Sequence, residues 1–168
     1  RCKVVLTGAG RVSQGAQYVM KHIEASQVTP SEFLGLNDVD KLTYVVLDVD
    51  SLVENNDPSI PFDFKDFIAN GHNYKSAFAK YAYVADVLIS CHFWSPGHPV
   101  YLDNDLLKDP SLNIRVIGDI TCDIQGSIMS TLRASTHDEP FYDFCTETLS
   151  EESPFSNPEN ITVMAVDT

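Results

Sequence analysis

Residues 3–15 of this chain are Lys3-Val4-Val5-Leu6-Thr7-Gly8-Ala9-Gly10-Arg11-Val12-Ser13-Gln14-Gly15. The first five form a short apolar run rich in β-branched side chains, which is typical of a buried strand. The glycines end this run, and from Val12 to Ile23 apolar residues recur every three or four positions, as one buried helix face requires. A strand, a glycine turn and a helix in this order predict the start of a βαβ unit.

Gly8, Gly10 and Gly15 form a GxGxxxxG variant of the GxGxxG dinucleotide fingerprint. At such a turn a pyrophosphate can approach the backbone closely, and the following helix N-terminus offers free N–H groups and a partial positive charge. We therefore expect a dinucleotide pyrophosphate on residues 8–13, with these cofactor-binding residues: Gly8, Gly10, Arg11, Val12 and Ser13. A mononucleotide P-loop is excluded because no Gly-Lys-Ser/Thr follows. The alternative is a glycine turn that serves packing alone.

Two segments compete to be the second strand of this unit. Residues 26–29 are short and end at Pro30, whereas residues 43–50 are longer and have the higher β propensity. The choice decides which acid could hydrogen-bond the adenine ribose of NAD. Glu32 follows the first segment, and Asp48 or Asp50 ends the second. Arg11 could instead contact a phosphate and favour NADP, so the sequence leaves the cofactor as NAD or NADP.

The rest of the chain continues to alternate between predicted strands and helices. We expect an irregular segment at residues 51–73, helices at 74–83 and 103–108, strands at 86–91, 113–120 and 161–166, and an exposed acidic loop at 146–160. This order predicts one α/β domain over residues 1–168, Rossmann-like and doubly wound, with a mainly parallel sheet. Ligands bind such sheets at the carboxyl ends of the strands, so residues 8–15, 90–94 and 118–123 should meet there.

Composition excludes several classes of partner. The chain has 168 residues, with 11 Lys and Arg against 24 Asp and Glu, and a net charge of −13. Nucleic acids and anionic membranes bind clustered Lys and Arg, so neither is an expected partner. The four cysteines are far apart, which favours reduced thiols in a cytoplasmic protein over disulfides or a zinc site. His92 and His98 lack neighbouring Cys or paired acids, so we expect no metal there.

Four further stretches carry a family resemblance. Residues 8–17, 88–94, 118–128 and 138–141 have the sequences GAGRVSQGAQ, LISCHFW, GDITCDIQGSI and DEPF. Together they resemble lysine-2-oxoglutarate reductases, saccharopine-forming enzymes that are similar to saccharopine dehydrogenases and, more distantly, to alanine dehydrogenase. The resemblance implies a cofactor along Gly10, Arg11, Cys91, His92, Asp119 and Ile120. It also implies that Asp123 lies near the amino-acid portion of the substrate.

In this family the Lys and His of acid–base chemistry belong to a preceding domain, so the resemblance implies no catalytic residue in this chain. The chain begins with Arg1 rather than Met and enters a predicted strand at once, as expected of a domain excised from a longer protein. We expect the complete protein to be an NAD(P)-dependent oxidoreductase acting on the CH–NH bond of an adduct of an amino acid and a 2-oxo acid. The fragment without its N-terminal substrate domain is expected to be inactive. The alternatives are a non-catalytic nucleotide-sensing module and an acidic protein-interaction domain.

Overall fold

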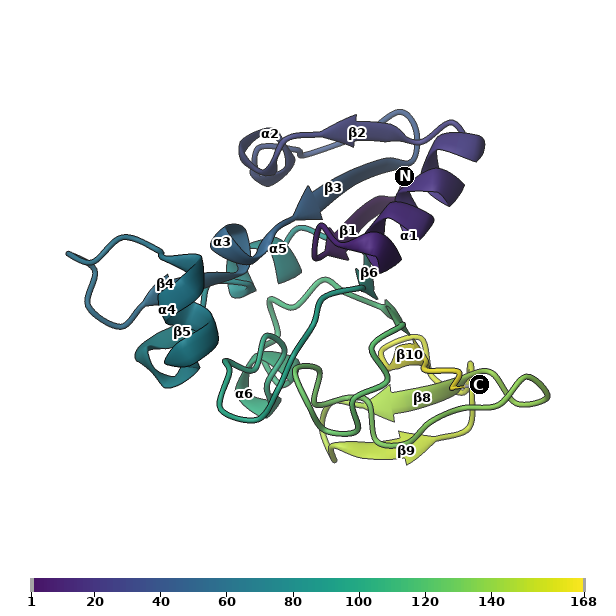
Figure 1. Ribbon diagram of the computed structural model, residues 1–168. Coiled ribbons are helices and arrows are strands. Elements are labelled where there is room, and N and C mark those ends of the chain that lie inside the picture. Colours follow the sequence, from purple (N-terminus) through teal and green to yellow (C-terminus); the bar gives the residue numbers. More distant parts are fainter. Residues whose placement is uncertain (1, 168) are drawn as a thin grey trace.

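A parallel sheet dominates the computed structural model, which describes residues 2–167 (Figure 1). Within this range the main sheet has eight strands in the order β2-β3-β1-β6-β7-β10-β8-β9. Strand β8 is antiparallel to both neighbours, and every other pairing in this sheet is parallel. The strands are β1 (Lys3–Thr7), β2 (Ser26–Val28), β3 (Thr43–Leu47), β6 (Val87–Ser90), β7 (Val116–Asp119), β8 (Tyr142–Cys145), β9 (Ser150–Glu152) and β10 (Ile161–Met164).

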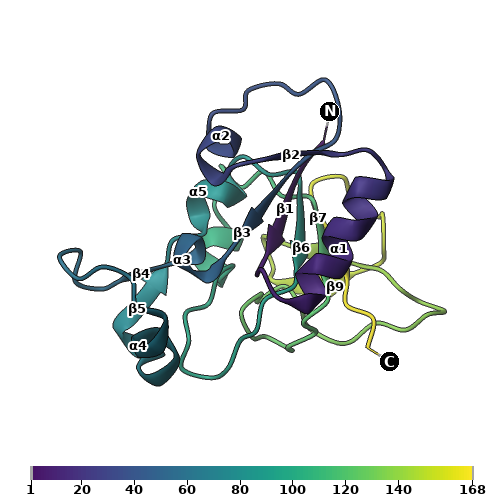
Figure 2. The same cartoon turned by 45° about the horizontal axis from the view of Figure 1, so that its top comes forward.

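Helices cover both faces of the N-terminal part of the sheet (Figure 2). Alternate residues of β1 point to opposite faces. Leu6 packs with Met20 of α1 (Arg11–His22), and Val5 lies in the larger core with Phe33 of α2 (Pro30–Leu34). The same core contains Tyr81 of α5 (Ala79–Ala82). This arrangement confirms the predicted α/β, Rossmann-like, mainly parallel fold.

Both segments that competed for the second strand are strands, and the later one is the neighbour of β1. Residues of β3 pair with β1 from Lys3↔Thr43 to Thr7↔Leu47, whereas β2 pairs with β3 alone among the described strands. Burial explains why β3, and not β2, lies next to β1. Tyr44, Val45 and Leu47 are buried, while the three residues of β2 are half-buried or exposed and Pro30 follows two residues later.

The predicted helix at residues 74–83 is wrong over its first half. Tyr74–Ser76 is strand β5, which pairs antiparallel with β4 (Val53–Asn55) in a separate two-stranded sheet. The segment predicted as irregular also contains α4 (Phe64–Ala69), beside the 3-10 helix η1 (Gly71–Asn73). Phe67 of α4 packs edge-on against Tyr74, with ring centroids 5.4 Å apart. Tertiary packing of these rings therefore overrides the local helical pattern.

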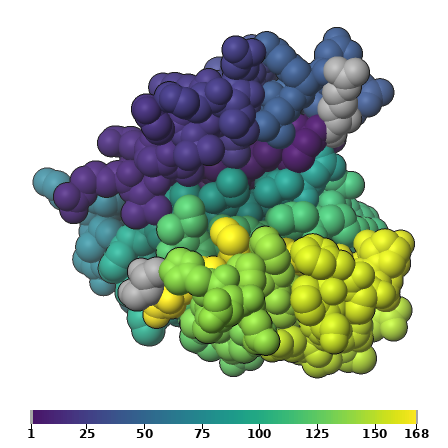
Figure 3. Space-filling model, turned by 90° about the vertical axis from the view of Figure 1, so that its right-hand side faces the viewer, coloured from purple at the N-terminus to yellow at the C-terminus, as the bar shows by residue number. Residues whose placement is uncertain are grey.

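Two strands in the C-terminal part were not predicted. All four residues of β8 are buried, and β9 lies within the segment predicted as an exposed loop. The predicted helix at residues 103–108 is confirmed as α6 (Asn104–Leu107), and the strands at 86–91, 113–120 and 161–166 are confirmed with shorter bounds. Figure 3 shows the N-terminal part of the chain stacked over the C-terminal part, with the middle of the chain between them. No helix among the described residues has the length and apolar character needed to cross a bilayer.

Candidate functional site

The glycine turn after β1 is packed against the ends of both neighbouring strands. Gly8 has a φ of +84°, and a Cβ at this position would lie 2.8 Å from the Cα of His92. Its N–H donates to the carbonyl of Leu47, at the end of β3, over 2.7 Å. A side chain at position 8 would therefore meet both an unfavourable backbone conformation and the main chain of the β6 loop. The loops after β1, β6 and β7 meet at this edge, as predicted, because Thr7 pairs with Ser90 and Ser90 with Asp119.

The N-terminus of α1 is uncapped and faces open space. Gly10 is the N-cap residue and supplies no side chain, and the first intrahelical bond runs from the N–H of Gln14 to the carbonyl of Gly10 over 3.0 Å. The preceding N–H groups of the helix consequently have no intrahelical acceptor. A Cβ at Gly10 would meet no atom within 4 Å. Free donors, the helix dipole and room at the backbone together favour an anion at this point.

Next to this turn lies a mainly apolar hollow with a volume of about 420 Å³. One wall comes from α3 (Val49–Leu52) and α4, whose Phe64 and Ile68 are 57% and 50% exposed. The glycine turn and the loop after β6 supply the other lining residues. The lining residues are Gly8, Ala9, Gly10, Arg11, Val12, Val49, Leu52, Phe64, Phe67, Ile68, Cys91, His92, Phe93 and Tyr101.

A buried histidine, His92, is among the residues that line this hollow. Nδ1 of His92 lies 2.7 Å from Oγ1 of Thr7, and Nε2 lies 2.7 Å from Oγ of Ser127. The N–H of Cys91 donates to the same Thr7 oxygen, so the threonine hydroxyl is free to donate to Nδ1 while Nε2–H donates to Ser127. Burial lowers the pKa of His92 to about 4, against an opposing effect of Asp119. The ring is therefore neutral at pH 7 and acts as a fixed hydrogen-bonding bridge.

The carboxylate of Asp119 is also bound within the protein. Oδ1 accepts hydrogen bonds from the hydroxyl of Ser90 and from the N–H and hydroxyl of Thr121, the last over 2.6 Å. Oδ2 accepts from the hydroxyl of Thr131 over 2.6 Å. The side chain is 2% exposed. These four bonds join β6, β7 and the following loop, and they use most of the acceptor capacity of the carboxylate.

The predicted site residues fall into three groups. Those that line the hollow are Gly8, Gly10, Arg11, Val12, Cys91 and His92. Asp119, Ile120 and Asp123 lie at the adjacent end of β7 and do not line it; Ile120 is exposed, and Asp123 is half-buried. Ser13 is completely buried, and its Oγ accepts a hydrogen bond from Gln17. Its side chain therefore faces away from the hollow, and only its backbone remains available there.

The pKa values of Cys91 and Asp123, both near the strand ends, are raised. Burial, and secondarily Asp119, raise the pKa of the Cys91 thiol to about 11. Burial is also the main cause of the raised pKa of the Asp123 carboxyl, and the charge of Asp119 is the second cause. A thiol with such a pKa stays protonated at pH 7 and is a poor nucleophile. Cys91 therefore contributes apolar surface to the hollow rather than reactivity.

Sequence reasoning missed the apolar wall formed by α3 and α4. Phe64, Phe67 and Ile68 have the spacing of one helix face, within a segment whose prolines and acids suggested irregular structure. That spacing was the sequence signal that could have identified α4. Pro58 and Pro61 precede α4, so they do not interrupt the helix.

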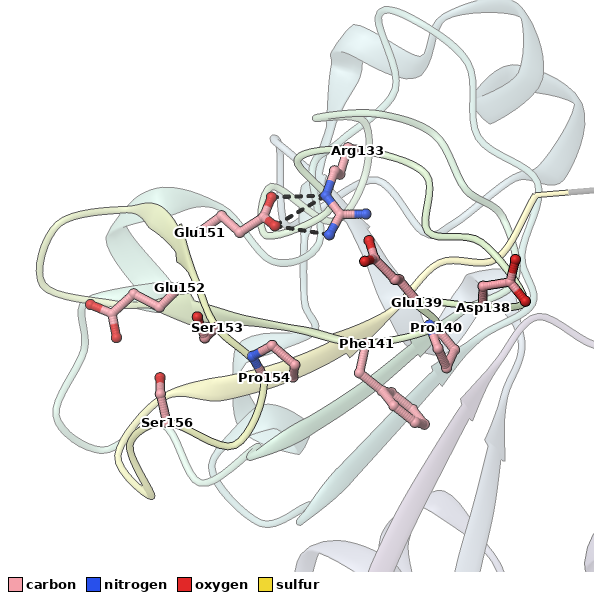
Figure 4. Close-up of a pocket in the computed structure, with 10 residues that line it drawn as sticks. All are labelled: Arg133, Asp138, Glu139, Pro140, Phe141, Glu151, Glu152, Ser153, Pro154 and Ser156. Atoms are coloured by element: carbon pink, nitrogen blue, oxygen red, sulfur yellow. Dashed lines mark hydrogen bonds and ion pairs between the residues drawn. The ribbon is translucent and has the colours of Figure 1, made fainter.

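A larger hollow of about 920 Å³ lies beside β8 and β9 (Figure 4). Its one cation, Arg133, is paired with Glu151, to which Nη2 donates over 2.8 Å. Asp138, Glu139 and Glu152 also line it. The excess of carboxylates repels anions, so this hollow does not suit a dinucleotide. Among residues 2–167 no three His, Cys, Asp or Glu side chains are arranged to hold a metal ion.

Comparison with known proteins supports the family resemblance. No protein-family model matches the chain. The chain is similar to alpha-aminoadipic semialdehyde synthase of Arabidopsis thaliana, with 34% identity over 158 residues. The match covers 83% of this chain and 15% of that relative. This similarity, over most of the present chain, confirms its resemblance to the lysine-2-oxoglutarate reductase/saccharopine dehydrogenase family.

Proposed function

We propose that this chain binds a nicotinamide dinucleotide, NAD or NADP, in the hollow beside the glycine turn. The observation that carries the proposal is the uncapped N-terminus of α1, which faces the hollow at the carboxyl edge of a parallel sheet. Ligands bind doubly wound folds at this edge, and a pyrophosphate suits free N–H groups at a helix N-terminus. The glycine at position 10 leaves the space that such a group requires.

The shape and chemistry of the hollow support an extended ligand. The pyrophosphate would lie against the backbone of residues 10–13, with the Arg11 guanidinium as a second source of positive charge. The adenine would pack among the apolar side chains of Val49, Phe64 and Ile68. The nicotinamide would lie toward the ends of β6 and β7, near Cys91 and Ile120. Because the His92 and Asp119 side chains are already hydrogen-bonded within the protein, their backbones rather than their polar atoms would face the cofactor.

For the whole protein we propose an oxidoreductase acting on the CH–NH bond of an adduct of an amino acid and a 2-oxo acid. The family resemblance supports this activity, and the relative's much greater length supports a separate substrate domain, since this chain spans 15% of it. The bound cofactor would supply or accept hydride. Asp123 would face the amino-acid portion of the substrate. Acid–base groups would come from the substrate domain, because the buried His92 and Asp119 at the strand ends are engaged in fixed hydrogen bonds. We place the protein in the cytoplasm on the same resemblance and on its reduced thiols.

Calorimetric titration with NADH and NADPH tests the binding site. Gly10→Val should abolish binding, because its side chain would occupy the space of the pyrophosphate, while the φ of −77° and ψ of −170° at Gly10 suit valine. Gly15→Ala is the matched control, since a Cβ there also meets no atom within 4 Å but lies one helical turn away from the free N–H groups. Unchanged binding by a folded Gly10→Val protein would contradict the proposal. Circular dichroism establishes that each variant is folded.

A non-catalytic nucleotide sensor is a second candidate. It is favoured by the same engagement of His92 and Asp119, which leaves neither side chain free for proton transfer. Turnover distinguishes the two functions. The full-length protein should oxidise NAD(P)H in the presence of an amino acid and a 2-oxo acid if it is an enzyme, whereas a sensor binds the nucleotide without consuming it.

A further inference from the structure

We propose that Trp94 is a positioning residue for substrate binding, because its indole holds the turn that carries Asp123. The inference rests on the proposed function, in which Asp123 faces the amino-acid portion of the substrate. It adds the residue that keeps this carboxylate in place. Trp94 follows β6 and Asp123 follows β7, and these two parallel strands are neighbours, so both residues lie at the same edge of the sheet.

The carboxylate of Asp123 is free to bind a ligand. It is half-buried, and no hydrogen bond or ion pair of this group is found within residues 2–167. Burial, and secondarily the charge of Asp119, raise its pKa, so a cationic partner would stabilise its charged form. The ammonium group of an amino acid supplies such a charge. Asp119, in contrast, has its acceptor positions occupied within the protein.

The turn around Asp123 has a backbone conformation that surrounding contacts must maintain. The N–H of Gly126 donates to the carbonyl of Asp123 over 2.9 Å and closes a β-turn over residues 123–126. Gln125 has a φ of +47° and Cys122 a φ of +52°, which are unfavourable for residues with a Cβ. The N–H of Gln125 donates to the carbonyl of Thr131 over 2.8 Å. The turn therefore keeps its shape through contacts with its neighbours.

Trp94 is one of these neighbours. Gly126 is buried, and a Cβ there would lie 3.2 Å from Cε3 of Trp94 and 2.6 Å from Cβ of Asp123. The absence of a side chain at Gly126 thus leaves room for the indole and for Asp123 together. The indole is itself fixed, since its Nε1 donates to the carbonyl of Pro99 over 3.0 Å. Trp94 therefore restricts the movement of Gly126 and, through the turn, that of Asp123.

The contact of Trp94 with this turn is separate from the dinucleotide hollow. Phe93, the preceding residue, lines the hollow, whereas Trp94 and residues 122–126 do not. Loss of the indole should therefore weaken substrate binding and leave the affinity for the nucleotide unchanged. This separation distinguishes positioning of Asp123 from a general loss of structure.

Steady-state kinetics of the full-length protein test this role, with NADH or NADPH and with lysine and 2-oxoglutarate, the pair that the family resemblance implies. Trp94→Ala should lower kcat/KM for lysine by about 10- to 100-fold, because displacing a positioned group by about 1 Å can cost this much. The loss should lie mainly in KM, as expected for a lost binding contact, while the KM for the nucleotide stays unchanged. Trp94→Phe retains a ring beside Gly126 and should restore most of the loss. Phe155→Ala, which removes an exposed ring in the loop after β9, is the control and should change neither constant.

Two further variants make the test independent of the folding of Trp94→Ala. Gly126→Ala places a Cβ against both Trp94 and Asp123, so it should raise the KM for lysine although the indole is intact. In a protein that already carries Asp123→Ala, Trp94→Ala should cause no further loss, because the indole acts through this carboxylate.

Three results would overturn the inference while leaving the proposed function intact. They are an unchanged KM for lysine in folded Trp94→Ala or Gly126→Ala, an equal rise in the KM for the nucleotide, and a full further loss from Trp94→Ala in the Asp123→Ala protein. Absence of turnover by the folded wild type with either nucleotide would instead contradict the proposed enzymatic function, and the inference with it.

Discussion

The imidazole of His92 is hydrogen-bonded both to the end of β1 and to a loop that lies 35 residues after His92 in the sequence. Its two hydrogen bonds, to Thr7 and Ser127, require a neutral ring with one donor and one acceptor. The family resemblance identified this residue as part of the site, but the chain gives no local signal for its partners, since Thr7 is 85 residues away. For the same reason, Asp119 could be recognised as a candidate ligand but not as a carboxylate already bound by Ser90 and Thr131.

This histidine should make the stability of the protein depend on pH. Its pKa is about 4 in the folded state, whereas an exposed His has a pKa of about 6.5. Between these values the unfolded chain binds the proton and the folded protein does not, so stability falls as the pH drops through this window. From pH 7 to about pH 5 the His92 contribution to the free energy of unfolding should decrease by about 2 kcal/mol.

Urea unfolding of the wild type and His92→Gln at both pH values measures this contribution. Glutamine retains a donor and an acceptor but does not titrate in this range. The free energy of unfolding of the variant should be lower than that of the wild type at pH 7. This difference should be smaller near pH 5, because only the wild type loses the His92 contribution as the pH falls. An identical pH dependence in both proteins would show that His92 is not buried and neutral.

At the scale of the elements, α1 contains a glycine that its position does not require. Gly15 lies within the helix, is exposed, and has open space where a Cβ would be. Glycine in a helix interior costs about 1 kcal/mol relative to alanine. Gly15→Ala should therefore raise the free energy of unfolding by about 0.5–1 kcal/mol, as measured by urea unfolding at pH 7. Reduced stability would mean that the position makes a contact the structure does not contain.

The elements with strong internal patterns were predicted correctly from the sequence. Strand β1 and helix α1 combine an apolar run, a glycine turn and a helical period, which suffice to place both elements. The expected buried face of α1 is wrong in part, because Val12, Val19 and Ile23 are exposed and Met20 is buried. The errors occur where pairing partners are distant. Tyr74 begins β5 because β4 pairs with it from about 20 residues upstream and Phe67 packs on its ring. Strand β8 was missed because its pattern includes the buried Asp143, whose carboxylate accepts a hydrogen bond from Thr162 of β10.

The candidate site was predicted in part for the same reason. Its glycine turn is contiguous in sequence, so the fingerprint identified it. The acid beside the turn was ambiguous because the order of β2 and β3 in the sheet depends on burial across the whole fold. The apolar wall from α4 was missed because its segment is mostly polar, and because the position of α4 depends on the packing of Phe67 against Tyr74 of β5.

At the scale of the whole molecule, the site is assembled from segments that unfolding would separate. The glycine turn, the start of α3, α4 and the loop after β6 all line one hollow. A ligand that binds only this assembled form stabilises the folded state by mass action, by about 2.7 kcal/mol at a concentration 100 times the Kd. NADH should accordingly raise the thermal unfolding midpoint of the wild type in a concentration-dependent manner. Gly10→Val should show no such shift, and an equal shift in that variant would place the binding site elsewhere.

The position of β2 has a consequence for the order in which the sheet assembles. Although β2 is made before β3 along the chain, its described partner in the sheet is β3 alone. It therefore has no pairing partner until β3 has formed, and it adds a strand of three residues to the edge of the sheet. Loop closure between residues 28 and 43 must precede this pairing. In native-state hydrogen exchange, the amides of β2 should accordingly open at a lower free energy than those of β1 and β3, as a unit that detaches while β1 and β3 stay paired.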